Sequence, residues 1–208
     1  SSSVSVIDTE TLTEVKRINT VNEPLRVTFN ADGSRAYILF HRPGTIAEID
    51  TSTHTQLRSV AIPLSSSFDF TISPDNRWLY AAGENVVVID LKTLTVHKII
   101  LTESTASGVA FSPDGVSVYV TVSYSTKFLI LDVATHSIRR SIDLGKNYQT
   151  IAISKNGAFI YLARIYENIF VFNTKTEKIM TEISGTTMSS ALCMNSNSTR
   201  AYACIFLY

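Results

Sequence analysis

The feature that most constrains the fold is a repeat of about 41 residues that runs through the whole chain. Five stretches join a short apolar run to a polar turn and a second apolar run, as in "GVAFSPDGVSVYVTV" at 108–122. A tyrosine follows each turn, and the spacings between these tyrosines are 43, 39, 42 and 41 residues. They are Tyr37, Tyr80, Tyr119, Tyr161 and Tyr202. A period of this length means that each unit is one supersecondary structure.

A second motif, typified by "VVVIDLKT", alternates with the first and has the same period. Its polar anchors are spaced by 42, 40, 42 and 41 residues. They are Asp8, Asp50, Asp90, Asp132 and Asn173. A side-chain oxygen at such a position can accept a hydrogen bond from a backbone N–H two residues later and close a turn. We therefore interpret these residues as structural, because equivalents in every repeat are too dispersed to form one site.

Each unit is predicted to contain four short strands, which in the third unit are 108–112, 117–122, 127–132 and 137–142. Valine, isoleucine, tyrosine and threonine dominate these runs, as is typical of strands. Four strands in about 40 residues are the pattern of a β-propeller blade. The sequence therefore predicts an all-β protein, a single propeller domain over 1–208 with four-stranded antiparallel blades.

The two ends of the chain each contain half a unit. Residues 1–18 hold the third and fourth strands of a blade, and residues 188–208 hold the first and second. Together they would form a composite blade beside four intact ones. Joining two strands from each end closes a propeller and hides its edge strands. We expect five blades closed in this way, with a fragment of a seven-bladed propeller as the alternative.

The stretch "SPDGVSVYVTV" followed by "LDVATHSI" resembles the YVTN family of β-propeller repeats, which is found in surface-layer-like proteins. The resemblance extends over essentially the whole chain. It implies a propeller of usually seven blades, and it favours the cell envelope or the extracellular space. One departure is Val122, which stands where the family usually has asparagine. Trp78 is the single tryptophan, and this disfavours the related WD40 repeat.

Composition narrows the classes of partner. Hydrophobic residues make up 45% of the chain and charged residues 17%, so it can bury a sizeable core. The 18 basic and 18 acidic residues give a net charge of zero, which does not favour nucleic acid. No apolar run approaches the roughly 18 residues of a membrane helix. We expect no nucleic-acid partner, no membrane span, no cofactor, and a monomer if the ring closes.

The candidate binding surface consists of the loops between the second and third strands together with the connections between blades. These segments vary between repeats and belong to one face, and variable loops on a rigid scaffold are where binding usually resides. The candidate binding residues are His41, Arg42, Asp69, Tyr124, Lys127, Lys146, Tyr148, Arg164, Tyr166 and Glu167.

The sequence holds none of the common catalytic motifs, such as Gly-x-Ser-x-Gly or His-Glu-x-x-His. We therefore predict no catalytic residues and no metal site, and a binding or scaffolding propeller that recognises a protein, peptide or glycan. One alternative is a hydrolase or lyase that uses Asp69, Glu167 and His41 at the central funnel. Another is a structural fragment of a larger propeller.

The two cysteines, Cys193 and Cys204, belong to neighbouring predicted strands. Their distances from the "NSNSTR" turn make a cross-strand disulfide geometrically possible. We favour the interpretation that they are two small buried residues, since other repeats have alanine or threonine at these positions.

Overall fold

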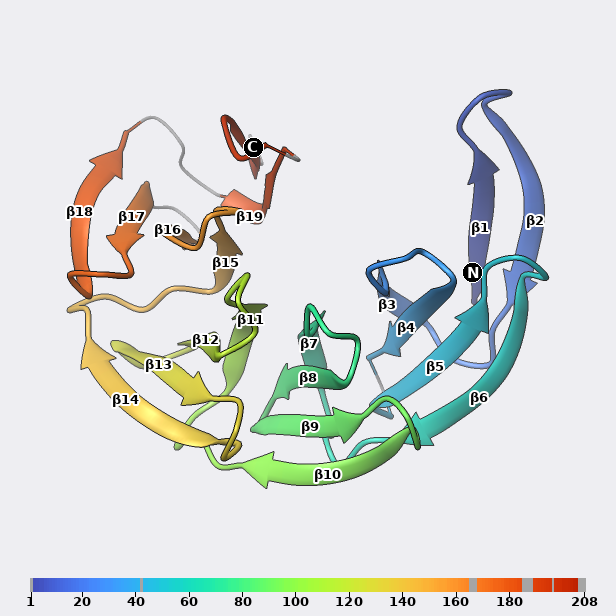
Figure 1. Ribbon diagram of the computed structural model, residues 1–208, viewed down its shortest axis with the longest axis horizontal. Helices are drawn as coiled ribbons and strands as arrows, with labels where there is room; N and C mark the ends of the chain where they lie inside the picture. Colours follow the sequence, from blue (N-terminus) through green and yellow to red (C-terminus); the bar gives the residue numbers. More distant parts are fainter. Residues whose placement is uncertain (1, 42, 165–167, 185–188, 196, 206–208) are drawn as a thin grey trace. The chain divides into compact units, whose positions relative to one another are not determined.

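A computed structural model describes residues 2–41, 43–164, 168–184, 189–195 and 197–205. In these residues the regular secondary structure consists of twenty β-strands (Figure 1). The chain divides into two compact units, Ser1–Ile99 and Ile100–Tyr208.

The first unit contains one strand pair and two four-stranded sheets. The pair is β1 (Ser3–Asp8) and β2 (Thr13–Asn19). The first sheet is β3 (Pro24–Phe29), β4 (Arg35–Phe40), β5 (Thr45–Asp50) and β6 (Thr55–Ala61). The second is β7 (Ser67–Ile72), β8 (Trp78–Gly83), β9 (Val86–Asp90) and β10 (Thr95–Ile100), whose last residue lies at the unit boundary.

The second unit contains two four-stranded sheets and one strand pair. The first sheet is β11 (Ala106–Phe111), β12 (Ser117–Val122), β13 (Lys127–Asp132) and β14 (Ser137–Asp143). The second is β15 (Thr150–Ile153), β16 (Phe159–Ala163), β17 (Ile169–Asn173) and β18 (Lys178–Ile183). The pair is β19 (Ser189–Met194) and β20 (Ala201–Ile205).

The strand order of each four-stranded sheet follows the chain, and the strand pairs are antiparallel, as in propeller blades. The predicted blade fold is therefore confirmed, with four complete blades and two strand pairs. In the third blade, β12 and β13 have the predicted bounds, and β11 and β14 differ by no more than two residues. Closure of the ring and the single domain stay predictions.

The turn between the first and second strands of a blade is held by side chains, as the sequence predicts. In the third blade, Ser112 Oγ donates to Asp114 Oδ1 over 2.5 Å and accepts the Ser117 N–H over 2.9 Å. Asp114 Oδ1 also accepts the N–H of Val116 over 3.0 Å. In the first blade, Asn30 replaces the serine, and its Oδ1 accepts the Arg35 N–H over 2.9 Å. These carboxylates and amides thus serve the turn.

The turn between the third and fourth strands uses the second motif. Asp50 Oδ1 accepts the N–H groups of Ser52 and Thr53 over 2.9 and 3.1 Å. Asn173 Oδ1 accepts the equivalent pair over 3.0 and 2.9 Å, so the turn does not need a charge. The residue four positions after each anchor has a left-handed backbone, with φ between 47° and 56°. These residues are Leu12, His54, Leu94, His136 and Glu177, and none of them is glycine.

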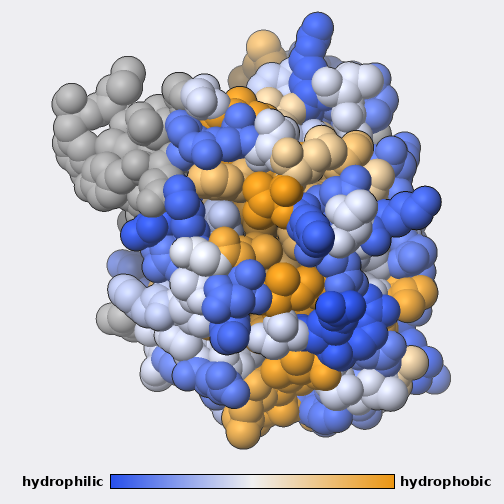
Figure 2. All heavy atoms as spheres, turned by 90° about the vertical axis from the view of Figure 1, so that its left-hand side faces the viewer, coloured by the Kyte–Doolittle hydropathy of each residue, from blue (hydrophilic) through white to orange (hydrophobic). Residues whose placement is uncertain are grey.

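The core lies between neighbouring blades. In the first unit it contains Leu39 and Ile46 from one blade and Leu79, Val87 and Ile89 from the next. Gly108 in the second unit shows how closely the blades approach. A Cβ at this position would lie 2.8 Å from Thr121 Oγ1 of the same blade and 2.9 Å from the carbonyl oxygen of Gln149, which precedes the next blade. The outer strands are largely exposed; Figure 2 shows the side of β14 and β18, where hydrophobic patches lie among hydrophilic residues.

One blade face in the first unit is covered only in part, by Val4 of β1 and Ile18 of β2. Val27 and Phe29 on β3 are 45% and 58% exposed, whereas their repeat equivalents Val109 and Phe111 are 4% and 6% exposed. A groove of about 370 Å³ with mostly apolar walls lies between this face and β1.

Acid pH should destabilise the fold through the turn aspartates. Hydrogen bonds from the Ser52 hydroxyl and the Thr53 N–H lower the pKa of Asp50 to about 2, from an ordinary value of 3.8. A lowered folded-state pKa contributes stability above the unfolded value and loses it as the pH falls through the folded value. We expect the melting temperature to fall between about pH 4 and about pH 2.

The variant Asp50→Asn should show a smaller fall over this range, because an amide oxygen can accept the same hydrogen bonds, as Asn173 does, but does not titrate. Circular dichroism melts at several pH values measure both. An acid dependence in the variant equal to that of the parent protein would contradict this explanation.

Candidate functional site

We call the end of each unit that carries the loops between second and third strands and the connections between blades its loop end. At the loop end of the first unit, His41 contacts the start of β7, and Asp69 belongs to this strand. The His41 Nδ1–H donates to the Ser67 carbonyl oxygen over 2.8 Å, and its ring meets Phe68 edge-on at 5.8 Å. Asp69 forms an ion pair with Arg26 at 3.2 Å, and Arg26 Nε donates to the Phe68 carbonyl oxygen over 2.9 Å. The sequence predicted His41 and Asp69 but missed Arg26 and Phe68, which complete this cluster.

At the loop end of the second unit, Tyr124 is 89% exposed and has a positive φ of 59°. Its loop is joined to the preceding blade connection, because the Ser123 N–H donates to the Thr105 carbonyl oxygen over 2.7 Å. That connection carries the exposed Leu101. Lys127 follows Tyr124 and lies 3.9 Å from Asp143. We call the residues Leu101, Tyr124 and Lys127 the Tyr124 surface.

Two further candidates meet Phe170 at the start of β17. Lys146 Nζ lies 4.7 Å from the centre of the Phe170 ring. The Tyr148 ring meets the same phenylalanine edge-on at 5.4 Å, and Tyr148 is only 4% exposed. The prediction that Tyr148 belongs to the binding surface is therefore wrong, because its ring fills the core between two blades.

Arg164 is half-buried just after β16. The candidates Arg42, Tyr166 and Glu167 lie outside the described residues. His136, in the turn between β13 and β14, is buried.

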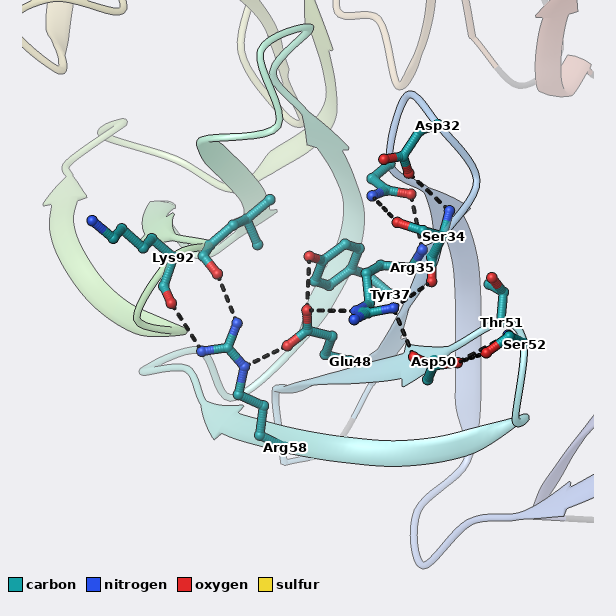
Figure 3. A network of polar contacts seen from close by, with 12 residues as sticks. Asp32, Ser34, Arg35, Tyr37, Glu48, Asp50, Thr51, Ser52, Arg58 and Lys92 are labelled. Atoms are coloured by element: carbon teal, nitrogen blue, oxygen red, sulfur yellow. Dashed lines mark hydrogen bonds and ion pairs between the residues drawn. The ribbon is translucent and has the colours of Figure 1, made fainter.

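A buried carboxylate that the sequence reading missed lies in the first blade (Figure 3). Glu48 on β5 accepts a hydrogen bond from the Tyr37 hydroxyl over 3.2 Å. It also pairs with Arg58 and lies 3.7 Å from Arg35, which pairs with Asp50 at 2.7 Å. The carboxylate is buried, and two partly exposed arginines pair with it, which is the arrangement that makes a buried carboxylate tolerable.

Arg58 extends this network to the next blade. Its guanidinium donates to the carbonyl oxygens of Leu91 and Lys92 over 2.9 and 3.0 Å. Arg140 has the same repeat position in the third blade. It pairs at 2.7 Å with Glu177, which lies in the turn between β17 and β18 of the following blade. Arginine at this position therefore connects a blade to the following one in both units.

The signal for Glu48 was present in the repeat. The equivalent residues are apolar in every other unit, namely Val6, Val88, Ile130 and Val171. A charge at a position that is otherwise apolar marks either a buried network or a site, and here the structure shows a network.

The cysteines do not form a disulfide. In the register of β19 and β20, Cys193 lies opposite Tyr202 and Cys204 opposite Ala191, so the two are not cross-strand partners. Both are exposed, and the expectation that they are buried is wrong. Within the described ranges, no three or more His, Cys, Asp or Glu residues are grouped as metal ligands. The same part of the chain has no helix suited to crossing a membrane.

Comparison with known proteins supports the fold and a partial homology. No family model matches the chain. A stretch of 98 residues is 37% identical to the seven-bladed beta-propeller protein Rv1057 of Mycobacterium tuberculosis; it covers 43% of this chain and 25% of that protein. The chain is thus a β-propeller protein with partial homology to Rv1057, of whose length it matches a quarter.

Three solved structures resemble the chain at low identity, which supports the fold alone. A protein of unknown function from Desulfotomaculum acetoxidans has a TM-score of 0.87 and 16% identity, over 98% of this chain and 69% of that one. The Cps50 (Swd1) propeller domain of Myceliophteria thermophila has a TM-score of 0.77 and 13% identity, over 88% of this chain and 62% of that one. Hydrazine synthase of Kuenenia stuttgartiensis has a TM-score of 0.77 and 20% identity, over 84% of this chain and 53% of that one.

Removing Arg58 should destabilise the protein more than removing Arg140. Arg58→Met leaves Glu48 buried without its main partner, which we expect to lower the free energy of unfolding by about 3 kcal/mol. Arg140→Met is the matched control, because it breaks a more exposed pair and should cost less than about 1 kcal/mol. Urea unfolding of both variants measures the difference, and equal losses would contradict the role given to Glu48.

Proposed function

We propose that this protein is a non-enzymatic binding propeller that recognises a protein or peptide through its loop end. In this proposal it is a YVTN-type propeller of the cell envelope or the extracellular space. The observation that supports the proposal most is the Tyr124 surface, where an aromatic ring is almost fully exposed on a strained backbone.

The backbone conformation of Tyr124 costs stability, and burial of its ring does not compensate. A left-handed backbone at a residue other than glycine costs roughly 1–2 kcal/mol. Its ring is left in water, so burial does not offset this cost. Tyrosine is enriched among the anchors of protein interfaces.

The neighbours of Tyr124 fit a protein or peptide ligand better than a small molecule. Leu101 adds a second exposed apolar side chain on a loop hydrogen-bonded to that of Tyr124. Lys127, three residues after Tyr124, adds a charged residue, which lies 3.9 Å from Asp143. An apolar centre with a polar rim is the usual anatomy of an interface.

The cluster at the loop end of the first unit has the same character. Phe68 is partly exposed between His41 and Arg26, and this combines an aromatic ring with a cation. The ion pair with Arg26 neutralises Asp69, so this carboxylate is better explained as a structural partner than as a catalytic group.

The test is selection of peptides from a displayed random library against the whole chain. We expect selected peptides to bind Tyr124→Ser at least about tenfold more weakly, because a central anchor carries a large share of the binding energy. Met180→Ser is the matched control, since Met180 is also an exposed apolar residue of the second unit but lies on the outer strand β18.

Peptides that bind the parent and both variants equally would contradict the proposal. A library that yields no binder, together with glycan-array binding that depends on Tyr124, would replace the peptide by a glycan.

A further inference from the structure

An open cleft of about 580 Å³ lies between the two complete blades of the second unit. The cleft lies at the end of the blades that carries the turn between the first and second strands, because this turn and Ser117, the first residue of β12, line it. The loop of Tyr124 follows the opposite end of β12. The volume is in the range of small-ligand sites. Its polar lining includes Ser112, Asp114, Tyr119, Arg139, Asn156 and Lys175.

Tyr119 is a largely buried residue that brings its hydroxyl to this cleft. The residue is only 7% exposed, and its ring stacks on Phe128 with the centroids 6.0 Å apart. Within the part of the chain that the structure describes, the Tyr119 hydroxyl has no hydrogen-bond partner, although its residue lines the cleft. Its donor is therefore available to a ligand.

In the first unit, the tyrosine at the same repeat position has a hydrogen-bond partner. Tyr37 occupies the same repeat position, and its hydroxyl donates to the carboxylate of Glu48 over 3.2 Å. Arg58 and Arg35 neutralise that carboxylate. An internal carboxylate therefore fills the first blade at this level.

The third blade lacks both the carboxylate and one of the cations. Ile130 stands where the first blade has Glu48, and Ser117 stands where it has Arg35. Ser117 lines the cleft. The junction between these blades has the tyrosine donor without its acceptor.

Two cations and one carboxylate line the cleft, and one of the cations, Arg139, also interacts with the carboxylates of Asp114 and Asp132. Arg139 and Lys175 line it, whereas Asp114, the carboxylate in the lining, accepts hydrogen bonds from Ser112 Oγ and the Val116 N–H. Glu177 is paired with Arg140 at 2.7 Å. Burial raises the pKa of Tyr119, with opposing effects from Arg139 and Asp114, so the phenol stays protonated at neutral pH and can donate.

We propose that this cleft binds the carboxylate of a ligand, which accepts a hydrogen bond from the Tyr119 hydroxyl and is neutralised by Arg139 and Lys175. The ligand is either a small dicarboxylate or an acidic residue of a peptide, and both present the same group. The site is separate from the Tyr124 surface and does not depend on the function proposed for it.

The test uses the whole chain and two carboxylate probes. Glutarate represents a small molecule, and acetyl-Ala-Glu-Ala-amide represents a peptide. Glutaramide and acetyl-Ala-Gln-Ala-amide are the neutral controls, and inorganic phosphate tests for general anion binding. Titrations followed by amide NMR shifts at pH 7 should show one or both carboxylates binding at the residues of the cleft.

The variant Tyr119→Phe should weaken this binding at least tenfold while leaving the melting temperature unchanged, because the hydroxyl has no partner to lose. Tyr37→Phe is the matched control: it should lower the melting temperature by removing a hydrogen bond to Glu48, and leave binding intact. Binding of glutarate alone indicates a small ligand, and binding of the peptide alone indicates a protein segment.

Four results would overturn the proposal. They are no binding by either carboxylate, equal binding by the neutral controls or phosphate, full binding by Tyr119→Phe, and a lower melting temperature in Tyr119→Phe. The last would mean that the hydroxyl already has an internal partner.

Discussion

The structure depends on the burial of each blade's apolar face against the next blade. A single four-stranded sheet of this chain cannot bury both of its faces, so its middle strands are covered only when neighbours pack on them. The core clusters contain residues from adjacent blades, and Gly108 is small because a neighbouring blade approaches its backbone. This requirement explains the repeat, because every unit must place apolar side chains at equivalent positions of its sheet.

The turns make such packing reproducible. Serine, aspartate or asparagine oxygens accept backbone N–H groups in every described blade, so strand lengths and registers repeat. With the scaffold fixed in this way, the blade junctions are free to differ. The first blade places Glu48 and its arginines at this level, whereas in the second unit a cleft lined by Ser117 lies between two blades. One architecture therefore yields both a packed network and a candidate site.

Strands and turns were predictable because they depend on local patterns. The alternation around "SPDG" places β12 and β13 to the residue, and the anchor positions identify the second turn. The left-handed residue after each anchor was not predictable, because leucine, histidine or glutamate gives no local sign of it.

Side-chain destinations were less predictable because they depend on the neighbouring blade. Tyr148 lies in a variable connection yet fills the space beside Phe170. Arg26 was missed because its partner Asp69 is 43 residues away, on the next blade. Glu48 could have been found by aligning the units, since the other four have an apolar residue there.

The exposed Val27 and Phe29 show which face still needs a neighbour, and the repeat predicts that the strands of the composite blade supply it. In the third blade Thr121 lies opposite Phe128, and the equivalents in the composite blade are Cys204 and Val4. The most direct measurement is oxidation of the double variant Val4→Cys/Cys193→Ser, followed by non-reducing electrophoresis and peptide mapping. A disulfide between position 4 and Cys204 within one chain is the result that ring closure predicts. Disulfide-linked dimers, or two free thiols, would contradict closure within the chain.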